Sequence, residues 1–159
     1  MEAPAADSVR TYLVVVDETP ESRVALRYAA LRARSVGGQM LLLHTMPAAE
    51  FIQWGGVQAA IEAEAAENAQ SLLGAIADEV VVWTGKRPGI IVTKGDAVAA
   101  VLATVAAEPS IHALVLGASA KGAPGPLVSY FAGEHAGTLP CLVMIVPGGL
   151  DEARLSALT

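Results

Sequence analysis

Five short apolar runs alternate along the chain with longer stretches of helical periodicity. The first run, TYLVVVD at residues 11–17, is continuous and rich in β-branched side chains. Such runs are typical of strands that other layers cover on both faces. Four similar runs follow at residues 39–47, 89–95, 111–119 and 140–148. The pattern therefore predicts five buried strands.

The stretch after the first run carries clear helix signals. Thr19 suits the N-cap position and Pro20 the first helical position, while Gly37 suits the end of the helix. A much longer helix is predicted over roughly 57–84 from its alanine-rich, periodic sequence. We expect its apolar face to consist of Ile61, Ala65, Leu72, Leu73, Ile76 and Val80.

Three further helices are predicted in the second half of the chain. Asp96 suits the N-cap of a helix that follows the third apolar run. Another helix is expected near 126–136, with Gly137 and Thr138 at its C-terminal end. Asp151 can cap one or two helical turns in the last ten residues.

This order of elements indicates the class of fold. Strands that alternate with helices of this length pair in parallel through right-handed crossovers. We therefore expect one α/β domain over residues 11–148, with a doubly wound, Rossmann-like, five-stranded parallel sheet. Residues 1–10 are expected to form a flexible N-terminus and residues 149–159 a short C-terminal tail. Ligands of such folds bind at the carboxyl ends of the strands, where the strand order reverses.

The composition agrees with a compact, heavily buried protein. Of 159 residues, 53% are hydrophobic and only 16% are charged. The formal net charge of −6 and the lack of a dense basic run argue against nucleic-acid binding. The acidic N-terminus lacks the order of a secretory signal, and no apolar run has the length of a membrane span. We expect a cytoplasmic protein that binds neither nucleic acid nor membranes.

No catalytic or metal-binding arrangement is recognisable in the sequence. Ser119 lacks the spacing of a nucleophile elbow, because Ala120 and Lys121 follow it. Cys141 opens a buried run and is interpreted as a small core residue. The histidines are separate from cysteine pairs and clustered carboxylates, which excludes the usual metal spacings: His44, His112 and His135. We expect a non-enzymatic protein, with an unrelated hydrolase on the same fold as the weakest candidate.

The loop GASAKGAPGPLVSYF, at residues 117–131, is the best candidate for a binding site. It follows the fourth strand and leads into a helix, and it carries three glycines, two serines and one lysine. Glycines allow backbone amides to approach a phosphate at the start of a helix. The groups that suit phosphate binding are the side chains or amides of Ser119, Lys121, Gly122, Gly125 and Ser129.

Several segments together resemble the universal stress protein family over nearly the whole chain. YLVVVDETPESRVALRYAALRA resembles its first strand and helix, and LLLHTM its second strand. VTKGD resembles the third strand, while HALVLGAS and LPCLVMIVP resemble the fourth and fifth. The resemblance implies a sheet of order 3-2-1-4-5. It also implies a homodimer formed through the last strand, by Val143, Met144, Ile145 and Val146.

The nucleotide-binding branch of that family has a recognisable glycine pattern after the fourth strand. The pattern is Gly, two residues, Gly, nine residues, Gly, then Ser or Thr. Gly117 matches its first position in this chain. Ala120 and Tyr130 stand at the second and third glycine positions, and Phe131 replaces the hydroxyl residue. The ATP-type pattern is therefore not intact.

The resemblance also implies roles for two residues at strand ends. The family position of Asp17 lies near the adenosine part of the ligand, and that of Thr45 lies beside the adenine. The residues alone leave a cap or turn role open for Asp17 and a strand-end role open for Thr45.

Two expectations for function stay open. The first is a non-enzymatic stress-response or regulatory homodimer whose nucleotide binding is lost or altered, with the rings of Tyr130 and Phe131 deciding what enters the loop site. The second is a sensor that binds ATP or AMP weakly. Phe51 and Trp54 suit the core, a cover over the site or an interface equally well.

Overall fold

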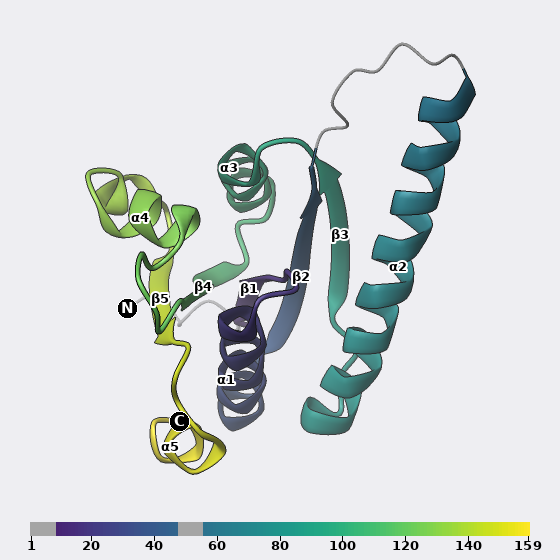
Figure 1. The fold of residues 1–159 in the computed structure, drawn as a ribbon. Helices are drawn as coiled ribbons and strands as arrows, with labels where there is room; N and C mark the ends of the chain where they lie inside the picture. The colour runs from purple at the N-terminus through teal and green to yellow at the C-terminus, as the bar shows by residue number, and fades with distance from the viewer. Residues whose placement is uncertain (1–8, 48–55) are drawn as a thin grey trace, which may run out of the picture.

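The five strands of the protein form one parallel sheet in the computed structural model, which describes residues 9–47 and 56–159 (Figure 1). The strand order is β3-β2-β1-β4-β5, as the family resemblance implies. The order reverses between β1 and β4, which lie next to each other in the middle of the sheet. The strands are β1 Thr11–Val15, β2 Gln39–Met46, β3 Gly89–Lys94, β4 Ile111–Ala118 and β5 Leu142–Pro147.

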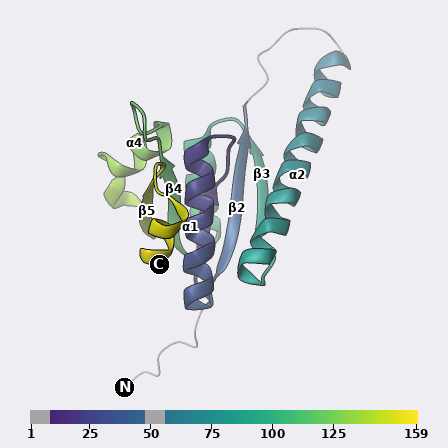
Figure 2. The same cartoon turned by 60° about the horizontal axis from the view of Figure 1, so that its bottom comes forward.

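Helices cover both faces of this sheet (Figures 1 and 2). α1, Pro20–Val36, and α2, Gly56–Thr84, lie on one face. α3, Ala97–Ala107, and α4, Pro126–Ala132, lie on the other. The segment expected as a C-terminal tail forms α5, Glu152–Ala157, which packs against α1 and buries Leu155. No helix in the described ranges is long and apolar enough to cross a membrane.

Each face of the sheet has its own hydrophobic core. Successive strand residues point to opposite faces, so Tyr12 and Val14 pack beneath α1 and α2. Leu13, between them, packs with Leu43 and Leu114 beneath α3 and α4. Both faces of the central strands are thus buried, which explains why their sequences are continuous apolar runs.

The predicted helix starts are correct, but one helix is shorter than expected. Thr19, Asp96 and Asp151 each accept a backbone N–H at the start of α1, α3 and α5. α4 ends at Ala132 rather than near 136, because the backbone leaves helical geometry at Gly133. The predicted helix end at Gly137 and Thr138 is instead a separate 3₁₀ turn, Ala136–Thr138.

α2 is far longer than the strands beside it. Its 29 residues span about 43 Å at 1.5 Å per residue, whereas the six residues of β3 span about 20 Å. The C-terminal half of α2 buries Leu73, Ile76 and Val80 against the sheet. The N-terminal half extends past the strand ends (Figure 1), and both Ile61 and Ala65 are exposed there. The predicted apolar face is therefore confirmed for the second half of α2 and wrong for the first.

Two predictions from the sequence fall mainly on residues that the structure does not describe. The expected flexible N-terminus, residues 1–10, lies outside the described residues except for its last two. Phe51 and Trp54 lie in the segment 48–55, which is also outside them.

Candidate functional site

A small cavity lies where β1 and β4 end, at the reversal of strand order. Its volume is about 130 Å³. The ends of β1 and β4, the first turn of α1 and the start of α4 supply its walls. The lining residues are Val15, Asp17, Thr19, Glu21, Ser22, Leu116, Gly117, Pro124, Gly125, Pro126, Leu127 and Val128.

The Asp17 carboxylate is engaged in the start of α1. Its Oδ1 accepts hydrogen bonds from the backbone N–H of Thr19, at 2.8 Å, and from the Thr19 hydroxyl. The Thr19 hydroxyl in turn accepts the N–H of Ser22 at 3.2 Å, which is the N-cap bond of α1. Asp17 is exposed, so its charge remains hydrated. Of the cap or turn roles that the sequence left open for Asp17, the structure shows the turn role, which orients the N-cap residue Thr19.

Gly117 lies against the backbone of α1. A Cβ at this position would stand 2.1 Å from the carbonyl oxygen of Glu21 and 2.4 Å from its carbonyl carbon. These distances are far below van der Waals contact, so only glycine allows α1 to approach β4 this closely. Gly117 therefore has a packing function whether or not a ligand binds.

The loop after β4 satisfies many of its polar groups internally. The Ser119 N–H donates to the carbonyl of Pro124 at 3.1 Å. The Ser119 hydroxyl donates to the carbonyl of Lys121 at 3.0 Å and accepts the N–H of Lys121 at 3.3 Å. Gly122 and Gly125 have positive φ angles of 75° and 115°, which turn the loop back into α4.

The structure gathers only some of the predicted site residues. Asp17, Gly117 and Gly125 line the cavity together. Thr45 lies on β2, where its hydroxyl is 3.1 Å from that of Thr93 on β3. The remaining predicted residues do not line the cavity: Ser119, Lys121, Gly122, Ser129 and Tyr130.

Nine of the twelve residues that line the cavity were absent from the predicted set, and three of them bear directly on ligand binding. Glu21 belongs to the first turn of α1, and Pro124 and Pro126 flank the start of α4. A signal for Glu21 was available, because the turn that follows a strand at a reversal point faces the ligand crevice. The prolines give no such signal, since the path of the loop decides whether they face inward.

Comparison with known proteins identifies the family. The sequence model of the universal stress protein family matches residues 8–147. This chain belongs to the universal stress protein family. No curated protein sequence matches it at a significant level.

Solved structures of universal stress proteins share its fold. The UspA protein of Lactobacillus plantarum superposes with a TM-score of 0.70 at 17% identity, over 86% of this chain and 97% of that one. A family protein from Burkholderia pseudomallei gives 0.63 at 16% identity, over 90% and 99%. A universal stress protein in complex with cAMP gives 0.54 at 16% identity, over 89% and 98%. At these identities the similarity shows the fold.

The two aromatic residues of the glycine pattern lie outside the cavity of this universal stress protein. Phe131 is 1% exposed and packs in the core beneath α3 and α4. Tyr130 stacks on His135, with ring centroids 4.2 Å apart and an angle of 11° between the rings. The expectation that the two rings control entry is therefore wrong: the prolines, Leu127 and Val128 form that wall.

His44, His112 and Cys141 of this universal stress protein are engaged in structural contacts. His44 Nδ1 lies 2.7 Å from the Val16 carbonyl, and His112 packs edge-on against Tyr12. Burial raises the pKa of the Cys141 thiol, although a backbone hydrogen bond at Leu114 partly lowers it, so little reactive thiolate forms near neutral pH. Within 9–47 and 56–159, no group of three metal-ligating side chains occurs.

Proposed function

We propose that this universal stress protein is a non-enzymatic regulatory homodimer that does not bind ATP at the ends of β1 and β4. The cavity at that place carries the proposal. Its volume of about 130 Å³ is well below the range of about 300–1,000 Å³ that is usual for small-molecule sites. A nucleoside triphosphate does not fit without a rearrangement of the loop.

The backbone around the cavity also offers few donors for phosphate. Phosphate binding at a helix start depends on free N–H groups. Pro124 and Pro126 have none, and Pro126 is the first residue of α4. The Ser119 N–H is already bonded to the Pro124 carbonyl.

The charges in the cavity wall act against an anion as well. Its ionisable side chains are those of Asp17 and Glu21, and no lysine or arginine lines it in the described part of the chain. Two carboxylates repel a phosphate group, most strongly at low ionic strength. Lys121, the one cation of the loop, is exposed and does not line the cavity.

The edge of the sheet supports the homodimer. β5 pairs with β4 on one side, and no described strand pairs with it on the other. Leu142 and Ile145 on this strand are 56% and 40% exposed. An apolar edge strand that remains open promotes aggregation, so pairing with a second copy across a twofold axis gives it cover.

A nucleotide sensor is the second candidate, and two observations favour it. A structural neighbour was solved in complex with cAMP. Asp17 and Gly117 also stand in the cavity wall at the ends of the expected strands. This candidate requires the loop from Ser119 to Gly125 to open.

Calorimetry separates the two candidates. Millimolar ATP with Mg²⁺, AMP and cAMP are each titrated into the purified protein, and its bound nucleotides are measured by mass spectrometry after denaturation. We expect flat titrations and no copurified nucleotide. Saturable binding that is weakened in Asp17→Ala and Ser129→Ala, but not in Asp96→Ala at the N-cap of α3, would establish the sensor instead.

A further inference from the structure

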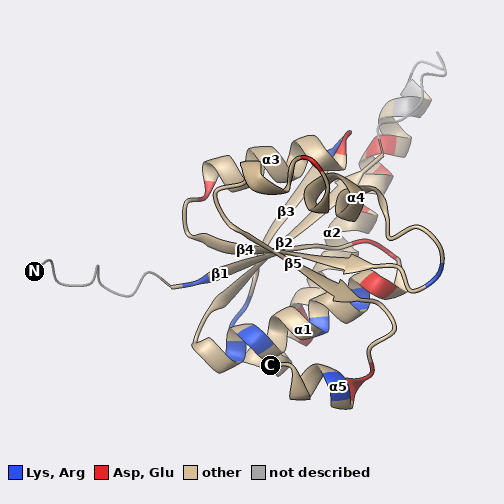
Figure 3. Ribbon diagram, turned by 90° about the vertical axis from the view of Figure 1, so that its left-hand side faces the viewer, with Lys and Arg blue, Asp and Glu red and all other residues tan. Residues whose placement is uncertain are grey.

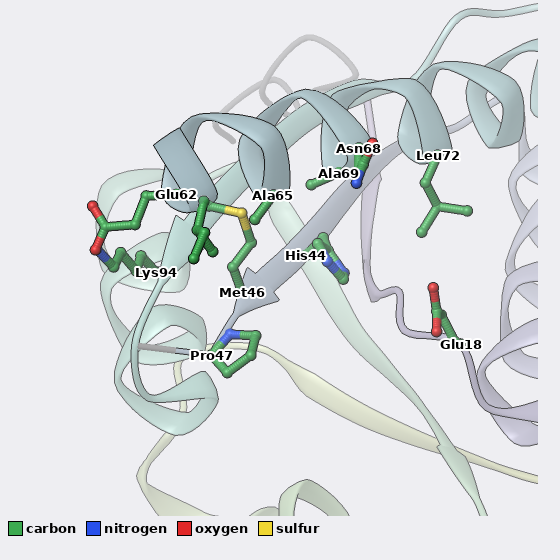
Figure 4. Close-up of a pocket in the computed structure, with 11 residues that line it drawn as sticks. Glu18, His44, Met46, Pro47, Glu62, Ala65, Asn68, Ala69, Leu72 and Lys94 are labelled. Atoms are coloured by element: carbon green, nitrogen blue, oxygen red, sulfur yellow. The ribbon is translucent and has the colours of Figure 1, made fainter. Parts of the chain in front are cut away.

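A second and larger cavity lies between α2 and the ends of β2 and β3. Its volume is about 530 Å³, which is within the usual range for a small-molecule site. It exists because the N-terminal half of α2 extends beyond the sheet that covers its C-terminal half. Figure 4 shows lining side chains of α2 and β2 on opposite sides of this space. The lining residues are Glu18, His44, Met46, Pro47, Ile61, Glu62, Ala65, Asn68, Ala69, Leu72 and Lys94.

The wall of this cavity is mainly apolar. Met46 and Pro47 at the end of β2 lie opposite Ala65 on α2, and Leu72 lies farther along the helix (Figure 4). Ile61, on the same helix, also lines the cavity. Met46 is only partly buried and Ile61 is 57% exposed, so these side chains do not fill the space between them. Burial of such surface by a ligand contributes about 25 cal/mol per Å² of apolar area.

The charges at the two ends of the cavity differ. At one end, Lys94 Nζ lies 2.6 Å from Glu62 Oε1, so the lysine is already paired (Figure 4). At the other end lies Glu18, whose carboxylate has no hydrogen bond or ion pair to any described residue. The net charge of the residues that line the cavity is therefore negative.

His44 adds a second acceptor between these two ends. Its Nδ1 lies 2.7 Å from the Val16 carbonyl oxygen, which only accepts hydrogen bonds. Nδ1 must therefore carry the proton, and in the neutral ring Nε2 presents a lone pair. Together, the Glu18 carboxylate and the His44 Nε2 suit a ligand group that donates hydrogen bonds and carries positive charge.

We propose that this cavity binds a small amphipathic amine. The hydrocarbon part lies against Met46, Ile61 and Ala65, and the ammonium group lies near Glu18 and His44. The excess of negative charge disfavours carboxylates and phosphates of the same size. This site is separate from the cavity at β1 and β4, because the two share no lining residue, so the inference does not depend on the proposed function.

Three probes with one hydrocarbon chain and different head charges test the proposal: n-octylamine, n-octanol and octanoate. Binding is followed by NMR of ¹³C-methyl methionine and by calorimetry. Met46 lines the cavity, whereas Met40 is 4% exposed in the core and serves as the internal reference. We expect a saturable Met46 shift, with octylamine binding most tightly, octanol less tightly and octanoate least. Equal affinity for octylamine and octanoate, or no saturable shift with any probe, overturns the proposal.

Two pairs of variants locate the site. Glu18→Gln is expected to weaken octylamine binding about three- to fivefold and to leave octanol unchanged, as for an exposed charge pair. Glu64→Gln, on an exposed position of α2 outside the cavity, is its control. Ala65→Leu fills part of the space and is expected to weaken the binding of octylamine and octanol alike. Ala75→Leu, on the same helix but outside the cavity, is expected to leave both affinities unchanged. Circular dichroism confirms that each variant is folded. Equal effects within either pair contradict the assignment.

Discussion

Gly117 fixes how closely α1 can approach the sheet, and this makes it a sensitive test of the packing. Gly117→Ala places a methyl group 2.1 Å from the Glu21 carbonyl oxygen, which belongs to backbone and cannot rotate away. We expect the free energy of unfolding to fall by about 3 kcal/mol, the upper part of the usual range for overpacking. Urea unfolding measures the change.

Gly74 provides the matched control for this substitution. It lies inside α2, and a Cβ there would meet nothing within 4 Å. Gly74→Ala should raise the free energy of unfolding by about 0.5–1 kcal/mol, because alanine restricts the unfolded chain and favours helix. A Gly117→Ala protein as stable as the original would show that α1 lies farther from β4.

Asp17 and Thr19 act as one unit at the start of α1, and their substitutions should therefore not be additive. Thr19→Ala removes the N-cap bond to Ser22 and should cost about 1 kcal/mol. Asp17→Ala removes the two bonds that orient Thr19 and should cost a similar amount, about 1 kcal/mol. The double variant should lose clearly less than the sum.

Asp96, the N-cap of α3, is the control for this comparison of single and double variants. Its carboxylate accepts the N–H of Ala99 and shares no partner with Asp17 or Thr19. The loss in free energy of unfolding from Asp96→Ala should therefore add to the loss from either of the other substitutions. Chemical denaturation of the single and double variants measures all the couplings. Full additivity of Asp17→Ala and Thr19→Ala would mean that the carboxylate does not support the cap.

The role of a residue in the candidate site depended on neighbours that the sequence does not identify. Gly117 and Asp17 were identified from their positions in the family pattern, at the ends of two predicted strands. Phe131 was misassigned because its direction depends on the phase of a helix of only 7 residues, which points it into the core. Pro124 enters the cavity wall through the turn that its carbonyl makes with Ser119.

At the scale of elements, the two halves of α2 have different roles in stability. Leu73 is fully buried beneath the helix, whereas Ile61 is 57% exposed at the larger cavity. Leu73→Ala should lower the free energy of unfolding by about 2–5 kcal/mol. Ile61→Ala should change it by less than about 1 kcal/mol, since little buried surface is lost. Thermal and urea unfolding of the two variants provide the comparison, and a large loss in Ile61→Ala would show that the cavity is closed.

The strands and caps were predictable because their determinants are local. An apolar run between turn residues and a cap such as Asp96 each act within a few positions of the chain. The open half of α2 was not predictable in this way. Periodicity identifies an apolar stripe, but it does not show that β3 ends before the helix does.

At the scale of the whole molecule, charge is distributed unevenly over the layers (Figure 3). α1 carries four of the ten lysines and arginines, whereas α3 has no charged residue along its 11 positions. The edge strand β5 has the sequence LVMIVP and contains no charged residue. Natural sheets commonly block an open edge with charge, so an apolar edge favours a partner.

The proposed homodimer can be broken at this edge. Ile145→Lys places a charge on an apolar side chain of β5 that is 40% exposed, where a single copy can hydrate it. In the dimer the same charge would be buried near its symmetry mate, and both desolvation and repulsion would oppose assembly. We expect sedimentation at micromolar concentration to show a dimer for the original protein and a monomer for Ile145→Lys.

Val82→Lys is the control, because Val82 is 84% exposed on α2, at the other end of the sheet. It should remain dimeric. A dimer also stabilises the folded state by mass action, so the unfolding temperature of the original protein and of Val82→Lys should rise with concentration. That of Ile145→Lys should not. If the original protein is a monomer, the proposed homodimer is wrong. If the unfolding temperature of Ile145→Lys still rises with concentration, the interface lies elsewhere.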